Sequence, residues 1–193
     1  MNNLSESRLM RWWESIFLSA SELKEKKILP APTLYKAQLK RCQVIDDVTL
    51  TEGFRALWFS LLEKAPEESA SEEKKAEEIE QKDMTLWAMI AVTLVYVKVN
   101  TPTNLATAAG TKTENDKPIV STLRFAQLQA AKTPDEFIMR LRRILQQLNG
   151  QVSVLSLAKD IEQWMKEHHQ SRPHRANKRL SVRWAMDYYK AAK

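Results

Sequence analysis

The chain has 193 residues and a formal net charge of +6, with 44% hydrophobic and 28% charged residues. This length suits one good core or two small helical subdomains that share one, and the composition is that of a soluble globular protein. Only three glycines are present, and alternating β-branched residues are rare, which favours an all-α fold over a sheet. The single cysteine, Cys42, excludes an intrachain disulfide and any Cys-based zinc site.

The N-terminal third is predicted to form three amphipathic helices, within residues 5–64, with a linker at 24–32. Leucines, tryptophans and phenylalanines recur there at helical spacing. Candidate N-caps precede each apolar stripe. In chain order, these caps are Ser5 or Ser7, Thr33, and Thr49 or Thr51.

The middle of the chain combines an acidic segment, a buried helix and a long connection. Residues 67–83 have almost no apolar side chain, so we expect a mobile segment or an exposed helix extension. The apolar run that follows predicts a buried helix over 84–99, with Asp83 as its cap. It is shorter than the ~20 residues that cross a bilayer, so we expect no membrane span. Residues 100–117, rich in Thr and Asn, are predicted to be a loop.

The C-terminal part is predicted to hold four further helices. The first starts at Pro118 or Ser121 and runs to about Ala131. The second has Thr133 as its cap and Pro134 at its first position, with Asn149-Gly150 at its end. Ser153 opens the third helix, and a last helix carries Leu180, Trp184 and Tyr188. The whole chain is therefore expected to be a single domain, 1–193, in the form of a bundle of about seven or eight helices.

The charges are distributed unevenly along the sequence. Residues 1–66 carry 10 Lys/Arg against 8 Asp/Glu, residues 67–83 carry 3 against 8, and residues 84–193 carry 17 against 8. The basic C-terminal part, 84–193, is thus the expected contact for a polyanion. The N-terminus shows no apolar signal core, and a lone cysteine is consistent with a reducing compartment, so we expect a cytoplasmic protein.

Three arginines flank the apolar stripe of the 134–149 helix. On a helical wheel Arg143 points nearly opposite the stripe, while Arg140 and Arg142 lie on its two flanks. Such side chains can line a surface along which a phosphate backbone runs, because a guanidinium donates bidentately. A solvated helix face with local ion pairs, such as Glu136–Arg140, is the alternative at this stage.

The last helix repeats this arrangement, since Arg179, Arg183 and Lys190 fall within about 40° of one another on the wheel. The alternative is a frayed basic tail that aids solubility. Five of the six tryptophans fall on apolar stripes and are expected in the core, which leaves Trp13 as the one that could be exposed. The three histidines lack a nearby carboxylate at metal spacing, so they are expected on a basic, solvent-facing turn.

The sequence gives little support for an enzyme. It has no GxSxG, no phosphate-binding P-loop, no HExxH and no Cys/His pair with obvious partners. We therefore expect a protein that is not an enzyme, with no cofactor and no metal.

In the order of these pieces, the chain resembles the CasB family, the small subunit of the type I-E CRISPR Cascade complex. Residues 119–145, IVSTLRFAQLQAAKTPDEFIMRLRRIL, are similar to the family's RF-type helix, short turn and LxxxLRRLL helix. LAKDIEQWM resembles its next helix, and LYKAQLKRC its basic second helix. The helix at 84–99 occupies the place of the family's buried central helix.

The resemblance implies an all-helical, non-catalytic subunit that is present in two copies along the crRNA-bound backbone. It also implies a basic surface that holds the displaced non-target DNA strand and supports the crRNA–target heteroduplex, with the backbone and large Cascade subunits as partners. On this basis we expect phosphate contacts from nine residues, the last two resting on the wheel alone. These are Lys36, Lys40, Arg41, Arg124, Arg140, Arg142, Arg143, Arg179 and Arg183. A helical adaptor that binds only proteins is the alternative function.

Overall fold

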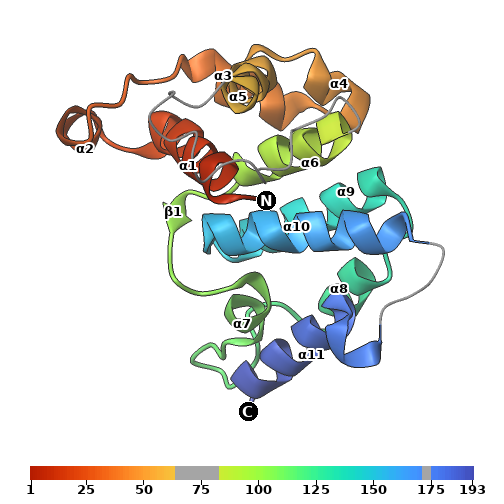
Figure 1. Ribbon diagram of the computed structural model, residues 1–193. Helices are drawn as coiled ribbons and strands as arrows, with labels where there is room; N and C mark the ends of the chain where they lie inside the picture. Colours follow the sequence, from red (N-terminus) through yellow and green to blue (C-terminus); the bar gives the residue numbers. More distant parts are fainter. Residues whose placement is uncertain (64–82, 171–174) are drawn as a thin grey trace. The chain divides into compact units, whose positions relative to one another are not determined.

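The computed structural model describes residues 1–63, 83–170 and 175–193, and within these ranges it is all-α apart from one two-residue strand pair and one isolated bridge (Figure 1). Eight of the eleven α-helices in these ranges are seven residues or longer, so the predicted helical bundle is confirmed. The chain divides into two compact units, Met1–Ala91 (unit 1) and Val92–Lys193 (unit 2). The predictions for 67–82 and for His174 lie outside the described residues.

Unit 1 is organised by three helices that contact one another, α1, α3 and α5. The Trp12 indole donates to the Gly53 carbonyl oxygen at 3.0 Å and joins α1 to α5. A Cβ at Gly53 would lie 2.9 Å from Tyr35 Cβ, so α3 and α5 touch at a point that only glycine permits. In chain order, the elements are α1 (Asn3–Phe17), α2 (Ala20–Glu25), α3 (Thr33–Arg41), α4 (Ile45–Thr49), α5 (Glu52–Leu62) and the start of α6 (Met84–Leu94).

Two of the predicted helix starts in unit 1 need correction. Asn2, not Ser5 or Ser7, caps α1: the Ser5 backbone N–H donates to Asn2 Oδ1 at 2.8 Å, and Ser5 Oγ accepts from the Asn2 backbone in return. Ser5 is therefore the second member of a capping box. α3 does begin at Thr33, but no side chain caps it.

The third start agrees with one of the two predicted caps, because Thr51 caps α5. Two short helices, α2 and α4, were not predicted, and α2 extends into the segment expected to be a linker. Trp13 is buried, with 3% exposure, and stacks on Phe17 at 5.3 Å between ring centroids. The expectation that Trp13 is exposed is wrong, because it joins the same core as Trp12.

Unit 2 begins with the end of α6, which stops at Leu94 instead of the predicted residue 99. The segment after it pairs in parallel with the residues that follow α9, in the register Val99↔Gln151 and Asn100↔Val152. The predicted loop at 100–117 contains a helix capped by Asn104. The elements of unit 2 are β1 (Val99–Asn100), α7 (Leu105–Gly110), α8 (Thr122–Gln129), α9 (Pro134–Gln147), β2 (Gln151–Val152), α10 (Val154–His168), η3 (Ala176–Lys178) and α11 (Leu180–Ala191).

The helix starts predicted in unit 2 are confirmed at Ser121, Thr133 and Ser153, each of which accepts a hydrogen bond from the first turn. After α9 the chain turns through two residues with positive φ, Asn149 at 52° and Gly150 at 70°. This turn directs the chain from α9 into β2.

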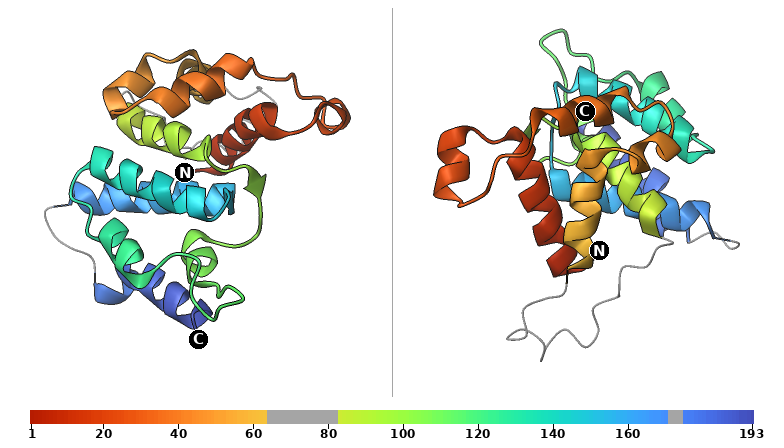
Figure 2. Two further views of the ribbon diagram at one scale, coloured as in Figure 1. Left: turned by 180° about the vertical axis from the view of Figure 1, so that it is seen from behind. Right: turned by 90° about the horizontal axis from the view of Figure 1, so that it is seen from above.

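A column of aromatic rings forms the core of unit 2 and joins α8, α9, α10 and α11. Trp164 and Trp184, which were predicted to be buried, belong to it, and every member but His168 is at most 9% exposed. Figure 2 shows these helices from two further sides. The successive ring pairs are Tyr188–Phe125 (4.6 Å), Phe125–Trp184 (5.9 Å), Trp184–Phe137 (6.3 Å), Phe137–Trp164 (4.4 Å) and Trp164–His168 (4.8 Å).

Candidate nucleic-acid interface

The two units carry charge of opposite sign. By sequence, Met1–Ala91 has 13 Lys/Arg against 16 Asp/Glu, whereas Val92–Lys193 has 17 against 8. Six of the nine predicted contact residues belong to unit 2. The excess of positive charge that is expected to attract a polyanion therefore lies in this unit.

The α9 arginines lie as the helical wheel predicts. The apolar face of α9 is buried, Arg143 is exposed, and Arg140 and Arg142 are half-buried on the flanks. On the neighbouring helix α8, Arg124 is also exposed. Arg124 and Arg143 are thus cations whose head groups reach solvent from two packed helices.

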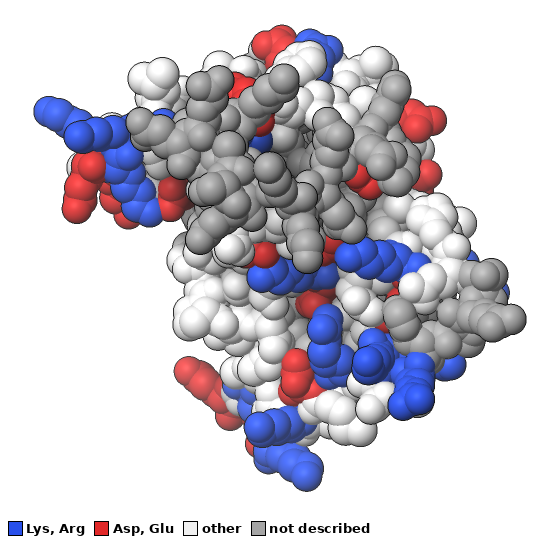
Figure 3. Space-filling view, in the orientation of Figure 1, with Lys and Arg blue, Asp and Glu red and all other residues white. Residues whose placement is uncertain are grey.

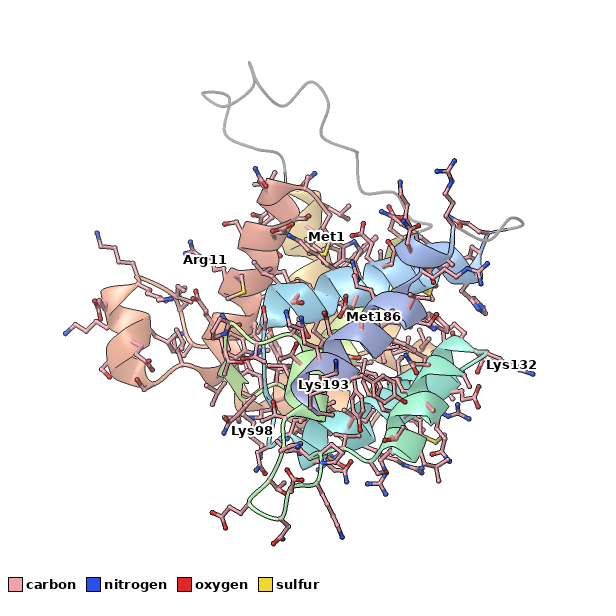
Figure 4. The ribbon with its side chains drawn as sticks, turned by 90° about the horizontal axis from the view of Figure 1, so that it is seen from below. Met1, Arg11, Lys98, Lys132, Met186 and Lys193 are labelled. Atoms are coloured by element: carbon pink, nitrogen blue, oxygen red, sulfur yellow. The ribbon has the colours of Figure 1, made fainter. Side chains whose placement is uncertain are left out.

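Arg140 joins α9 to α8. One of its nitrogens pairs with Glu136, one turn earlier on the same helix, and another donates to the Gln127 carbonyl oxygen of α8. The Lys132 backbone N–H donates to Glu136 at 2.7 Å, and this bond, aided by Arg140, holds the pKa of Glu136 below its ordinary value. Lys132 itself lies in the connection between α8 and α9 and is labelled in Figure 4. Arg140 therefore has a structural role in the α8–α9 hairpin as well as a charge.

Arg142 points to the other flank of α9. Its guanidinium carbon lies 5.5 Å from the centroid of the Tyr96 ring, in the segment that follows α6. A cation over an aromatic face is attracted by the ring's quadrupole. Arg142 thus helps to hold α9 against that segment.

Arg183 belongs to a polar cluster between α10 and α11. It donates to Asp160 Oδ1 at 2.7 Å, and the Trp184 indole donates to Asp160 Oδ2 at 2.8 Å, so one carboxylate of α10 holds two residues of α11. Burial raises the pKa of Asp160, against the two hydrogen bonds. A hollow of about 370 Å³ lies beside this cluster, with Lys159 and Arg183 among its lining residues. Asp160 and this pairing were missed in the sequence, since the partners lie 23 residues apart.

A second group of exposed cations extends along α10, η3 and α11. Figure 3 shows Lys and Arg gathered along α10 and around both ends of α11. We call this group the α10–α11 basic surface. It includes the predicted Arg179 and Arg183 and several cations that the sequence reasoning missed, although the spacing of Lys159 and Lys166 on α10 could have indicated them. Its members are Lys159, Lys166, Arg175, Lys178, Arg179, Arg183, Lys190 and Lys193.

The three remaining candidates, Lys36, Lys40 and Arg41, lie on α3 in unit 1. Lys36 Nζ stands 4.1 Å from the centroid of the Phe17 ring of α1, and Lys36 and Lys40 are half-buried. Arg41, the last residue of α3, is exposed. Only Arg41 of this trio therefore presents most of its side chain to solvent.

The described ranges contain neither a metal-binding cluster nor a helix that could span a membrane. Within 1–63, 83–170 and 175–193, no three His, Cys, Asp or Glu side chains are grouped so that they could hold a metal ion. No helix in the same ranges is both long and apolar enough to cross a membrane. His168 and His169 are exposed at the end of α10, as predicted for a solvent-facing turn.

Comparison with known proteins decides the family. The family model of CRISPR-associated protein Cse2 matches residues 35–189, well over half of the chain. The chain belongs to the Cse2 family. Neither the curated proteins nor the solved structures yield a match.

Cse2 is CasB, the type I-E small subunit, so the resemblance seen in the sequence is confirmed. Membership makes the chain a structural subunit of a type I-E Cascade complex, with other Cascade subunits as its partners. The match contains all nine candidate residues and all of α3 to α10, except for the first two residues of α3. α1 and α2 precede it.

Proposed function

We propose that this Cse2 chain is a non-catalytic subunit that stabilises the R-loop through phosphate contacts. It binds the displaced non-target strand and supports the crRNA–target heteroduplex, in the cytoplasm, in two copies per complex beside the backbone and large subunits. The observation that carries the proposal is the concentration of exposed Lys and Arg on unit 2, mounted on helices whose opposite faces are buried. Because R-loop formation is a nearly balanced strand exchange, a few backbone contacts are enough to tip it.

Different cations have different parts in this proposal. Arg124 and Arg143, with the α10–α11 basic surface, reach phosphates directly. Arg140 and Arg142 keep the α8–α9 hairpin and the segment after α6 in place, in addition to adding charge. Such contacts are independent of base sequence and weaken as salt is raised.

The test reverses the charge of the two exposed arginines, Arg124→Glu and Arg143→Glu, in the assembled complex. The matched control is Lys24→Glu with Lys27→Glu, which makes the same charge change at exposed positions of unit 1. We expect the first variant to assemble normally and to shorten the lifetime of the R-loop, and the control to match the unmodified chain. Equal R-loop lifetimes for both variants would refute the phosphate contacts.

A helical adaptor that contacts only proteins is the second candidate. It is favoured by the large apolar side chains that unit 1 exposes on α5 and just before it, Leu50 at 74% and Phe59 at 62%. On that hypothesis the Arg124/Arg143 variant is incorporated poorly into the assembly. In the complexes that do contain it, R-loops keep their normal lifetime. A nuclease assay of the pure chain with divalent metal tests the non-catalytic part, because metal-dependent turnover contradicts it.

A further inference from the structure

The aromatic column of unit 2 ends at an exposed ring. Its inner members are buried, but His168 is exposed, and its imidazole stacks on Trp164 with 4.8 Å between centroids and 10° between the planes. Trp164 in turn stacks on Phe137 at 4.4 Å. His168 is therefore held in a fixed plane from below by the core while it remains accessible from solvent. A ring held in this way is a platform for another planar group.

A hollow of about 190 Å³ lies next to this ring. Its lining includes Gln129, Trp164, Glu167, His168, Ser181 and Trp184. The volume is below the ~300–1,000 Å³ of pockets that enclose drug-sized ligands. It therefore suits a single planar ring system, not a cofactor.

The polar groups that line the hollow include both donors and acceptors, and among the donors are a second N–H of the Gln129 amide and the Ser181 hydroxyl. Glu167 Oε1 receives hydrogen bonds from Gln163 Nε2 at 2.7 Å and from the Leu180 backbone N–H at 2.8 Å, and Gln129 Nε2 donates to the Ser181 carbonyl oxygen at 2.8 Å. From the described residues, no hydrogen bond reaches Glu167 Oε2 or Gln129 Oε1. Either acceptor can receive a hydrogen bond from an exocyclic amino group, which cytosine, adenine and guanine have and thymine lacks, and the donors can bond to a base carbonyl oxygen.

Basic residues lie on the segment that leads into α11, next to the hollow. The hydrogen bond from Leu180 to Glu167 ties the start of α11 to the end of α10. Arg175 and Lys178, both exposed, come shortly before Leu180. A nucleotide whose base lies in the hollow would therefore have guanidinium and ammonium groups available for its phosphates.

We propose that this hollow takes one unpaired nucleobase of a single strand, stacked on His168, with its amino group on Glu167 or Gln129. This site rests on the proposed function, because it adds a binding site for a base to the proposed phosphate-binding surface. It would let the α10–α11 basic surface prefer a single strand over a duplex, whose bases are already stacked and paired.

The experiment compares two single strands of equal length, an oligo-deoxycytidine and an all-abasic strand that keeps only sugars and phosphates. Binding of each to the full chain is measured by fluorescence anisotropy for the unmodified protein and for His168→Ala, His168→Phe and His169→Ala. His169→Ala removes the adjacent exposed ring, whose centroid lies 5.3 Å from that of His168 but which does not line the hollow, so it separates the base site from the contact between the two histidines. Melting curves check that each variant is folded.

We expect His168→Ala to weaken binding of oligo-deoxycytidine by about fivefold or more and to leave the abasic strand unaffected. His168→Phe, which keeps a ring, and His169→Ala should match the unmodified chain, and an oligo-thymidine should bind more weakly than oligo-deoxycytidine. If His168→Ala weakens both strands equally, or neither, the base site is wrong while the phosphate surface stands. If neither strand binds the unmodified chain, the proposed function fails first.

Discussion

Replacing Asp160 by alanine tests what holds α11 on α10. This contact also fixes the part of the α10–α11 basic surface that α11 carries. Asp160 is 6% exposed, and its carboxylate accepts from the Trp184 indole and the Arg183 guanidinium. Removing it leaves a buried indole N–H without an acceptor, at about 1–3 kcal/mol. The pair with Arg183 adds at most about 1 kcal/mol, because the Arg183 side chain is 53% exposed. Relief of the buried charge offsets part of this, so we expect a loss of about 2 kcal/mol.

Thermal unfolding followed by circular dichroism measures this loss. A change of about 2 kcal/mol lowers the Tm of a chain of this size by roughly 4–8 °C. Asp160→Asn is the control, because its carbonyl oxygen can still accept from the indole, and it should lose less than half as much. If Asp160→Asn is as unstable as Asp160→Ala, the indole hydrogen bond is not what holds α11, and the reasoning is refuted.

The same carboxyl group predicts a pH dependence. Burial raises the pKa of Asp160 above its ordinary value of 3.8, so between these two values the folded chain keeps a proton that the unfolded chain has released. The free energy of unfolding contributed by this group therefore falls as pH rises through that window and is level above it. The Tm of the unmodified chain, measured relative to that of Asp160→Asn, should therefore fall as pH rises through this window. A relative Tm that rises with pH there would contradict the raised pKa.

Three further predictions concern close approaches in unit 2, all measured by chemical denaturation. Gly110→Ala places a Cβ 2.2 Å from the Tyr188 carbonyl oxygen, so α7 must move away from α11. We expect the free energy of unfolding to fall by about 2–3 kcal/mol. An unchanged denaturation midpoint would refute this contact. Gly150→Ala adds a side chain at φ 70° and 2.3 Å from the Tyr96 carbonyl oxygen, and should lose at least about 2 kcal/mol. Tyr188→Phe removes a buried hydroxyl that donates to the Val120 carbonyl oxygen at 2.6 Å, and should lose about 1 kcal/mol.

Local signals in the sequence were enough for the helices of unit 2 that carry the arginines. Thr133 and Pro134 mark the start of α9, and the period of its apolar residues places Arg143 on the exposed side. The cap of α1 was misassigned because Asn2 and Ser5 both carry capping side chains, and only their mutual hydrogen bonds show which one caps. The strand pair β1–β2 could not be predicted, since two residues carry no periodicity and their partners lie some fifty positions away.

For the candidate site, too, the local features could be predicted from the sequence and the tertiary contacts could not. Exposure of Arg124 and Arg143 follows from helix geometry, which depends on neighbours three and four residues apart. The attachments of Arg142 to Tyr96 and of Arg183 to Asp160 are tertiary, so no spacing rule reveals them. The same holds for His168, whose role as the exposed end of an aromatic column depends on which core residue lies beneath it.

The central claim is that exposed cations of unit 2 contact nucleic-acid phosphates, and the salt dependence of binding tests it most directly. Affinity of the assembled complex for a single strand is measured over a series of salt concentrations, with the unmodified chain, the Arg124/Arg143 double charge reversal and the Lys24/Lys27 control. Loss of two phosphate contacts should make the slope of log K against log salt shallower by about 1.4. The control should keep the slope of the unmodified chain. A double variant with weaker binding but an unchanged slope, or with both unchanged, would contradict the account.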